Sequence, residues 1–170
     1  MSFLTKNRII GLVLAAIIFA ADQWIKKVID VDLAMRLGDR IDLLPVFALH
    51  RTHNYGVSMG MFEATSPEMR WALVALTALI AVVVCVWMLR EKALGDIIGL
   101  SMILGGALGN IIDRYDYGYV LDYADLHING FSPFLIFNVA DAAITIGVVI
   151  ILARSFFVRD KDPTDTSEAA

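Results

Sequence analysis

The sequence predicts an all-α membrane protein with four transmembrane helices, a small extracytoplasmic β-sheet and a surface helix. The first observation is composition: 58% of the 170 residues are hydrophobic, whereas a soluble domain is closer to about half apolar. The second is that the apolar residues cluster into long runs, with a mean hydropathy of +0.69. The net charge of −4 argues against nucleic acid as a partner, because no basic stripe is available to neutralise phosphates.

Four apolar runs define the expected helices, at about residues 9–25, 71–89, 97–112 and 134–158. Residues 71–89 carry no charged side chain, and at about 1.5 Å per residue such a run spans roughly 28 Å, nearly a hydrocarbon core. The third run is short and contains Gly99, Gly105, Gly106 and Gly109. Because small residues let helices approach closely, we expect this helix at the centre of the bundle.

The first run could be mistaken for a cleavable signal peptide, since Lys6 and Arg8 precede it. However, the sequence from Asp22 to Lys26 follows without a small-x-small cleavage site, so we expect an uncleaved helix. The single cysteine, Cys85, lies inside the second run and is expected to serve packing.

Basic residues divide evenly between the two sides of the predicted bundle. One side would hold Lys6, Arg8, Arg90, Lys92, Arg154, Arg159 and Lys161, and the other Lys26, Lys27, Arg36, Arg40, Arg51, Arg70 and Arg114. The first group occupies much shorter segments, which favours it as cytoplasmic. Both termini would then be cytoplasmic, and two segments, at about residues 26–70 and 113–133, would be extracytoplasmic.

The outer segment of residues 26–70 is expected to be structured. Apolar residues recur at helical spacing between Lys26 and Leu37, which predicts a surface helix. Residues 40–62 predict short strands around an Asn54-Tyr55-Gly56 turn, with Val57, Met59 and Met61 alternating after it. We expect one integral-membrane domain over residues 1–159 and a disordered cytoplasmic tail over residues 160–170.

Two aspartates stand out because carboxylates are costly in or near a bilayer. Asp141 interrupts the last apolar run, about two turns after Phe134, and Asp122 follows the third run. Both would lie near the outer membrane face, where two adjacent acids could perform aspartic-protease chemistry. The alternative is that Asp122 is a hydrated loop residue and Asp141 makes a structural hydrogen bond.

Other polar residues surround these acids in the sequence. Asn138 precedes Asp141 by three positions, so the two would share a helix face, and Asn54 and Asn110 offer similar amides. Arg114 could extend to the membrane interface or bind a carboxylate or substrate backbone. Asp22 could cap a helix or pair with Lys26, four positions later.

No metal or cofactor is expected. The three histidines, His50, His53 and His127, do not form a zinc motif. No Gly-x-Ser-x-Gly motif or nucleotide-binding loop is present in the sequence.

Five motifs in order together resemble one family, the lipoprotein signal peptidases (signal peptidase II). They are Asp22-Gln-x-x-Lys26, Asn54-x-Gly56, the Gly105-to-Arg114 segment with Asn110 and Asp113, Gly118-x-Val120-x-Asp122, and Phe137-Asn138-x-Ala140-Asp141. The resemblance implies a bacterial inner-membrane aspartic endopeptidase that cleaves prolipoproteins just before the diacylglyceryl-modified cysteine. It implies that Asp122 and Asp141 are catalytic, that Asn54, Asn110, Arg114 and Asn138 line the site, and that Asp22 and Asp113 support it.

The chain departs from the family pattern after Gly56, where it reads Val57-Ser58-Met59-Gly60-Met61-Phe62, and at Tyr123, where Phe is common. These positions bear on substrate preference and not on the acids. The expected partners are diacylglyceryl-modified prolipoproteins and membrane lipids, and the chain is expected to be a monomer. The rival interpretations are a proton-coupled transporter, which usually shows internal repeats that we do not find here, and a lipid-binding scaffold.

Overall fold

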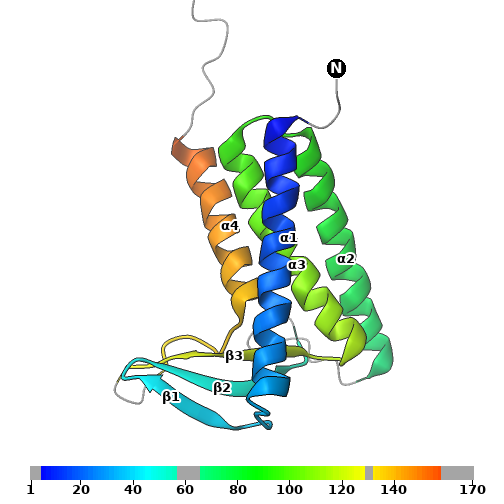
Figure 1. Cartoon of the computed structure of the whole chain (residues 1–170). Helices are drawn as coiled ribbons and strands as arrows, with labels where there is room; N and C mark the ends of the chain where they lie inside the picture. Colours follow the sequence, from blue (N-terminus) through cyan, green and yellow to red (C-terminus); the bar gives the residue numbers. More distant parts are fainter. Residues whose placement is uncertain (1–4, 57–65, 129–131, 158–170) are drawn as a thin grey trace, which may run out of the picture.

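The computed structural model describes residues 5–56, 66–128 and 132–157. Within these ranges, four helices are long and apolar enough to cross a membrane. They are α1 (Lys6–Lys27), α2 (Pro67–Arg90), α3 (Leu94–Asp116) and α4 (Val139–Phe157). Figure 1 shows them side by side, with a small sheet at one end, here called the sheet end. The four-helix membrane class is therefore confirmed.

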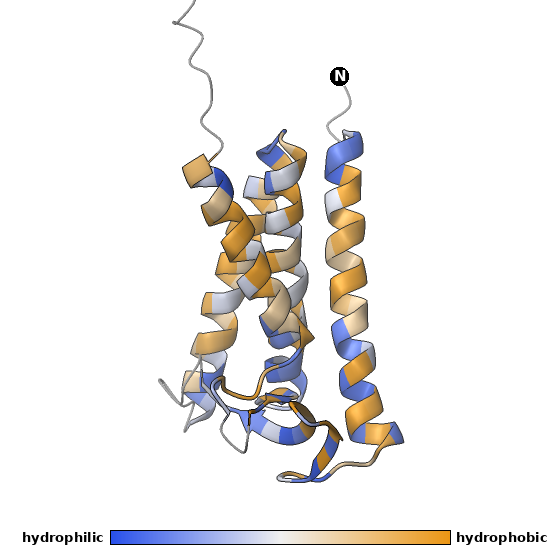
Figure 2. Cartoon of the chain, turned by 90° about the vertical axis from the view of Figure 1, so that its left-hand side faces the viewer, coloured by the Kyte–Doolittle hydropathy of each residue, from blue (hydrophilic) through white to orange (hydrophobic). Residues whose placement is uncertain are grey.

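Helix α3 packs against α1, α2 and α4, as its glycines predicted. A Cβ atom on Gly106 would lie 2.4 Å from the carbonyl oxygen of Ala140 on α4. A Cβ atom on Gly109 would lie 2.4 Å from the carboxylate of Asp22 on α1. Only glycine permits these approaches, so α3 fixes the spacing between α1 and α4. By contrast, the outward faces of the helices are largely apolar (Figure 2).

Helix α4 begins five residues later than expected. Residues 134–137 are apolar but not helical, and Phe137 forms an antiparallel bridge with Ala124. The main-chain N–H of Phe137 donates to Ala124, and its carbonyl accepts from Tyr123 and Ala124. Asp141 consequently lies in the first turn of α4, not two turns inside it.

The expected surface helix is shorter than predicted and continuous with α1. The chain passes directly from α1 into a π-helical turn, Val28–Asp32, and the helix ends there. Ile29 and Met35 are buried against Leu121, Tyr123 and Ala124 of the sheet. Of the apolar residues that predicted the surface helix, Ile25 and Ile29 pack against the sheet, whereas Leu33 and Leu37 are exposed.

The sheet has three antiparallel strands in the order β1 (Arg40–Leu44), β2 (Phe47–Asn54) and β3 (Val120–Leu126). Strands β1 and β2 fall where the sequence predicted them, whereas β3 was not predicted. The predicted strand over Val57, Met59 and Met61 lies outside the described residues, as do residues 160–170. The pairing of β2 with β3 shifts between Leu49 and Thr52, which places one extra β2 residue opposite Tyr123, next to Asp122.

Candidate active site

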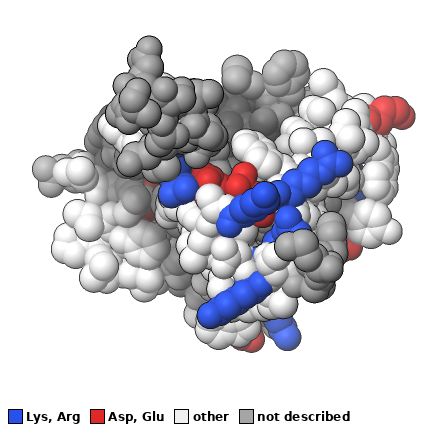
Figure 3. All heavy atoms as spheres, turned by 90° about the horizontal axis from the view of Figure 1, so that it is seen from above, with Lys and Arg blue, Asp and Glu red and all other residues white. Residues whose placement is uncertain are grey.

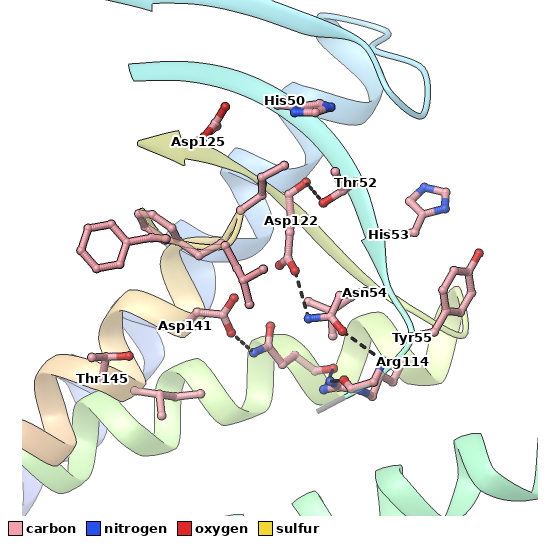
Figure 4. A pocket seen from close by; sticks show the side chains of 18 of the residues that line it. His50, Thr52, His53, Asn54, Tyr55, Arg114, Asp122, Asp125, Asp141 and Thr145 are labelled. Atoms are coloured by element: carbon pink, nitrogen blue, oxygen red, sulfur yellow. Dashed lines mark hydrogen bonds between the residues drawn. The ribbon is translucent and has the colours of Figure 1, made fainter. Parts of the chain in front are cut away.

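The polar site lies where β3, the end of β2, α3 and the start of α4 meet (Figure 4). Asp122 sits in the middle of β3 and is only 3% exposed. Its neighbours Leu121 and Tyr123 pack against the core beneath the sheet. Because side chains alternate along a strand, Asp122 projects to the other side, toward Asp141.

Asn138 and Asp141 form a reciprocal cap at the start of α4. The side-chain oxygen of Asn138 accepts a 2.8 Å hydrogen bond from the main-chain N–H of Asp141. The main-chain N–H of Asn138 donates in turn to the Asp141 carboxylate at 3.3 Å. This is the geometry of a capping box, in which both orphan donors of a helix start find partners. The two residues are therefore close because Asn138 caps the helix, not because they share a face within it.

The two acids, here called the acid pair, are held by the same set of amides. Asn138 is fully buried and donates to Asp122 at 2.7 Å. Asn54, the last residue of β2, donates to the other Asp122 oxygen at 3.1 Å. Asn110 on α3 donates to Asp141 at 2.8 Å. Each acid thus has amide or N–H donors on both oxygens, and Asn110 also accepts from Asn138 at 3.2 Å.

The pKa of Asp122 is raised from 3.8 to about 7. Burial is the main cause, because it disfavours the charged carboxylate, and the negative charge of Asp141 adds to it. The amides of Asn54 and Asn138 and the charge of Lys26 oppose the rise. Two neighbouring carboxyl groups of this kind are suited to sharing one proton.

Arg114 supports the site from the end of α3. Its side chain is buried, with 7% exposure, so it does not extend to the membrane interface. Among the described residues, its guanidinium donates to main-chain carbonyls: that of Gly56 at 2.7 Å and that of Asn110 at 3.4 Å. The contact with Gly56 holds the Asn54-Tyr55-Gly56 turn, where the Asn54 side chain also accepts from the Gly56 N–H at 3.0 Å.

Asp22 and Asp113 lie behind the acid pair and bind the main chain next to it, at Ala140 and Leu121 respectively. Both contact the Lys26 ammonium, at 2.7 and 2.8 Å. The expected pairing of Asp22 with Lys26 is therefore present, and Asp113 is a second partner. The sequence indicated Lys26 only as a possible partner of Asp22, and its contact with Asp113 was not predicted.

A groove of about 990 Å³ opens beside the acid pair. The polar residues of its lining come from the sheet, from the helices α2, α3 and α4 and from Ser132, and they include Asn54, Asn110 and Arg114. Its apolar lining comes from the three helices α2, α3 and α4 and from residues 134–137: Ile80, Ile103, Ala107, Ile144, Phe134, Leu135, Ile136 and Phe137. Two of the three histidines, His50 and His53, also line it, while His127 contacts Arg40 at 3.2 Å outside it. The groove could hold an extended, partly apolar ligand against two carboxyl groups.

Solved structures with this architecture are known. A bacterial membrane enzyme solved by the in meso method superimposes with a TM-score of 0.75 at 26% identity, over 89% of this chain and 93% of that one. A second bacterial membrane enzyme solved by the same method gives a TM-score of 0.72 at 28% identity, over 89% of this chain and 94% of that one.

Sequence comparisons are more specific. The chain is 49% identical to a lipoprotein signal peptidase of Sphingopyxis alaskensis, over 89% of this chain and 87% of the relative. It is 48% identical to a lipoprotein signal peptidase of Rhizorhabdus wittichii, over 96% of this chain and 95% of the relative. The family model described as signal peptidase (SPase) II matches residues 14–157. The chain, with its two carboxyl groups held by shared asparagines, therefore belongs to the signal peptidase II family.

Proposed function

We propose that this protein is an intramembrane aspartic endopeptidase that removes signal peptides from bacterial prolipoproteins. It cleaves the peptide bond just before the diacylglyceryl-modified cysteine, with Asp122 and Asp141 as the catalytic pair. The proposal rests above all on Asn138, whose side chain joins the two acids by donating to Asp122 and accepting from the main chain of Asp141. Family membership supports the reaction class.

The two acids have different roles in the proposed reaction: Asp122 is the proton donor and Asp141 is the general base. Asp122 holds the proton, since burial raises its pKa to about 7, and it donates to the scissile carbonyl oxygen. Asp141 takes a proton from a water molecule as the water attacks the carbonyl carbon. When the tetrahedral intermediate collapses, Asp141 gives that proton to the leaving amine and the C–N bond breaks. Asp122 takes its proton back from the hydroxyl group that becomes the new carbonyl, so the pair returns to its starting state. No metal and no nucleophilic side chain take part.

The groove supports a substrate that arrives from the bilayer. Its apolar lining continues from the acid pair along α2, α3 and α4, which are themselves apolar on their outward faces. A signal helix could enter sideways with its acyl chains remaining in lipid. The scissile bond would then lie between the acid pair, under the sheet.

We further propose that the sheet end faces the outside and that both termini are cytoplasmic. Ion pairs are present at both ends: Lys26, Arg40 and Arg51 are paired at the sheet end, and Arg154 is paired at the opposite end. Basic side chains are prominent on the opposite end of the bundle, seen in Figure 3. The two ends carry equal numbers of basic residues, but those opposite the sheet lie in much shorter segments, which is typical of cytoplasmic segments.

A cleavage assay with a diacylglyceryl-modified precursor tests the proposal. Asp122→Asn and Asp141→Asn each keep the shape of the site and remove one carboxyl group. We expect both variants to accumulate in the membrane and to lose cleavage by about 100-fold or more. Near-wild-type cleavage by either variant would show that the assignment is wrong. Solute flux through wild-type vesicles, without cleavage, would instead favour the transporter interpretation.

A further inference from the structure

A buried ammonium group lies behind the acid pair and is linked to both acids. Lys26, near the end of α1, is 6% exposed. Its Nζ contacts the carboxylates of Asp22 at 2.7 Å and Asp113 at 2.8 Å, and the side-chain oxygen of Asn110 at 3.4 Å. An ammonium group has three donors, so these three acceptors account for all of them.

Each of the three acceptors is also hydrogen-bonded either to one acid of the pair or to the main chain of the residue before it. Asp22 accepts a 3.0 Å hydrogen bond from the main-chain N–H of Ala140, the residue before Asp141. Asp113 accepts a 3.0 Å hydrogen bond from the main-chain N–H of Leu121, the residue before Asp122. Asn110 donates directly to Asp141.

The uncharged side-chain amide of Gln23 belongs to the same cluster. Its side-chain nitrogen contacts Asp22 at 3.2 Å, Asp113 at 3.0 Å and the carbonyl oxygen of Gly109 at 3.3 Å. The two carboxylates are consequently fixed on both sides, and neither can turn without losing a hydrogen bond to the backbone beside an acid.

The energetics favour a positioning role for this cluster. A buried ion pair contributes little net stability compared with well-packed apolar side chains of similar volume. What it supplies here is a fixed orientation of two carboxylates, on which the backbone beside Asp122 and Asp141 depends. It also supplies a positive charge that lowers the pKa of Asp122 against the effect of burial.

We infer that Lys26 is a positioning residue for the acid pair, and that it acts through Asp22 on the start of α4 and through Asp113 on β3. The inference rests on the proposed function, because it assigns Lys26 to the same reaction. The charged and titratable groups around the acid pair are Lys26 and Asp22 from α1, Asp113 and Arg114 from α3, and, from the sheet side of the groove, Arg40, His50, His53 and Asp125. Lys26 is the one that joins both acids through the backbone.

Two variants change the cluster in different ways, and they are measured in the full-length enzyme with a lipid-modified precursor. Lys26→Gln removes the charge, while Asp113→Asn keeps an acceptor for Leu121 and breaks the ion pair. For folded protein, we expect kcat to fall about 10- to 100-fold, because small displacements of reacting groups carry such costs. KM should change by less than about threefold, because neither residue lines the groove.

The pH profile separates positioning from a merely structural role. Without the Lys26 charge, the pKa of Asp122 rises, so the profile of Lys26→Gln should move toward higher pH by roughly half a unit or more. Lys26→Arg keeps the charge with different geometry, so its kcat should fall while its pH profile stays in place. Asp96→Asn breaks the Asp96–Arg154 pair at the far end of α3 and should change neither kcat nor the profile.

The outcomes for Lys26 and for the acid pair are distinguishable. If Asp122→Asn is inactive but folded Lys26→Gln has wild-type kcat and pH profile, the role of Lys26 is refuted and the catalytic pair stands. If Asp122→Asn remains active, the proposed function itself fails. Should Lys26→Gln not accumulate, Lys26→Arg decides: reduced kcat in folded protein supports the inference, and wild-type kcat overturns it.

Discussion

The side-chain amide of Asn138 donates a 2.7 Å hydrogen bond to the carboxylate of Asp122. The same side chain caps α4 by accepting from the main-chain N–H of Asp141 at 2.8 Å. One residue therefore sets both the start of a helix and the separation between β3 and that helix. Folding of α4 and assembly of the acid pair depend on the same amide.

Substitutions of Asn138 separate these two tasks. Asn138→Ala should lower the stability by about 0.5–2 kcal/mol through loss of the cap, and should also abolish cleavage. Asn138→Ser keeps an oxygen that can cap the helix but has no amide to donate to Asp122, so it should retain most of the stability and lose activity. Thermal unfolding and cleavage assays measure the two effects.

The cap at another helix provides the control for Asn138. Ser66 caps α2 by accepting from the main-chain N–H of Met69, and it does not line the groove. Ser66→Ala should cost a similar stability with cleavage preserved. An Asn138→Ser variant with wild-type activity would contradict the bridging role.

The raised pKa of Asp122 makes stability depend on pH. A carboxyl group whose pKa is raised from 3.8 to about 7 on folding binds its proton more tightly in the folded state. It therefore contributes stability below about pH 4, and this contribution is lost as the pH rises toward and through 7. Asp122→Asn carries no titrating group there, so its stability should fall less over this range. Unfolding temperatures at pH 5 and pH 8 test this, and parallel pH dependences in the two proteins would contradict it.

The same pKa predicts the alkaline limit of activity. If Asp122 must hold the proton, kcat/KM should fall as the pH rises through about 7, because kcat/KM reports ionisation in the free enzyme. The measurement is the initial cleavage rate at low substrate concentration from pH 5 to 9. A rate that stays constant to pH 9 would show that Asp122 is not the proton donor.

A bulky side chain in the groove should hinder substrate without disturbing the acids. Thr145 on α4 lines the groove, so Thr145→Trp should raise KM several-fold and leave the pH dependence of kcat unchanged. Ile146, its neighbour, is 49% exposed and is not part of the lining. Ile146→Trp should have wild-type KM, and equal effects from the two substitutions would argue that substrate does not use the groove.

Close packing of α3 can be tested at Gly109. Gly109→Ala would place a Cβ atom 2.4 Å from the Asp22 carboxylate, and overpacking of this kind costs about 1–3 kcal/mol. Leu108, next to it, is 39% exposed, so Leu108→Ala serves as a control with little loss. The unfolding temperature in detergent distinguishes the two, and an unaffected Gly109→Ala protein would contradict the packing.

Apolar runs predicted the membrane helices because lipid contact requires continuous apolar surface. The same signal placed the start of α4 too early, since residues 134–137 are apolar yet lie extended beside β3. Asn138 three positions before Asp141 is itself a capping pattern, and it marks the true start. Strand β3 was missed because it is buried along nearly its whole length, so it lacks the alternation that identifies a half-exposed strand.

The acids and asparagines of the site could be predicted from ordered motifs, but their connections could not. The pairing of Lys26 with Asp22 follows from helical spacing, whereas its pairing with Asp113 arises only when α1 packs on α3. Likewise, the contact of Asn54 with Asp122 depends on the register between β2 and β3. Such contacts between distant segments are set by tertiary packing, which local patterns do not encode.

The most direct test of the central claim compares Asp122→Asn, Asp141→Asn and the double variant in single-turnover cleavage of a diacylglyceryl-modified precursor. If the two acids act as one catalytic unit, either single substitution should remove nearly all activity and the double variant should be no slower than the singles. Single variants that keep near-wild-type rates, or losses that multiply in the double variant, would contradict the claim that Asp122 and Asp141 work together on one peptide bond.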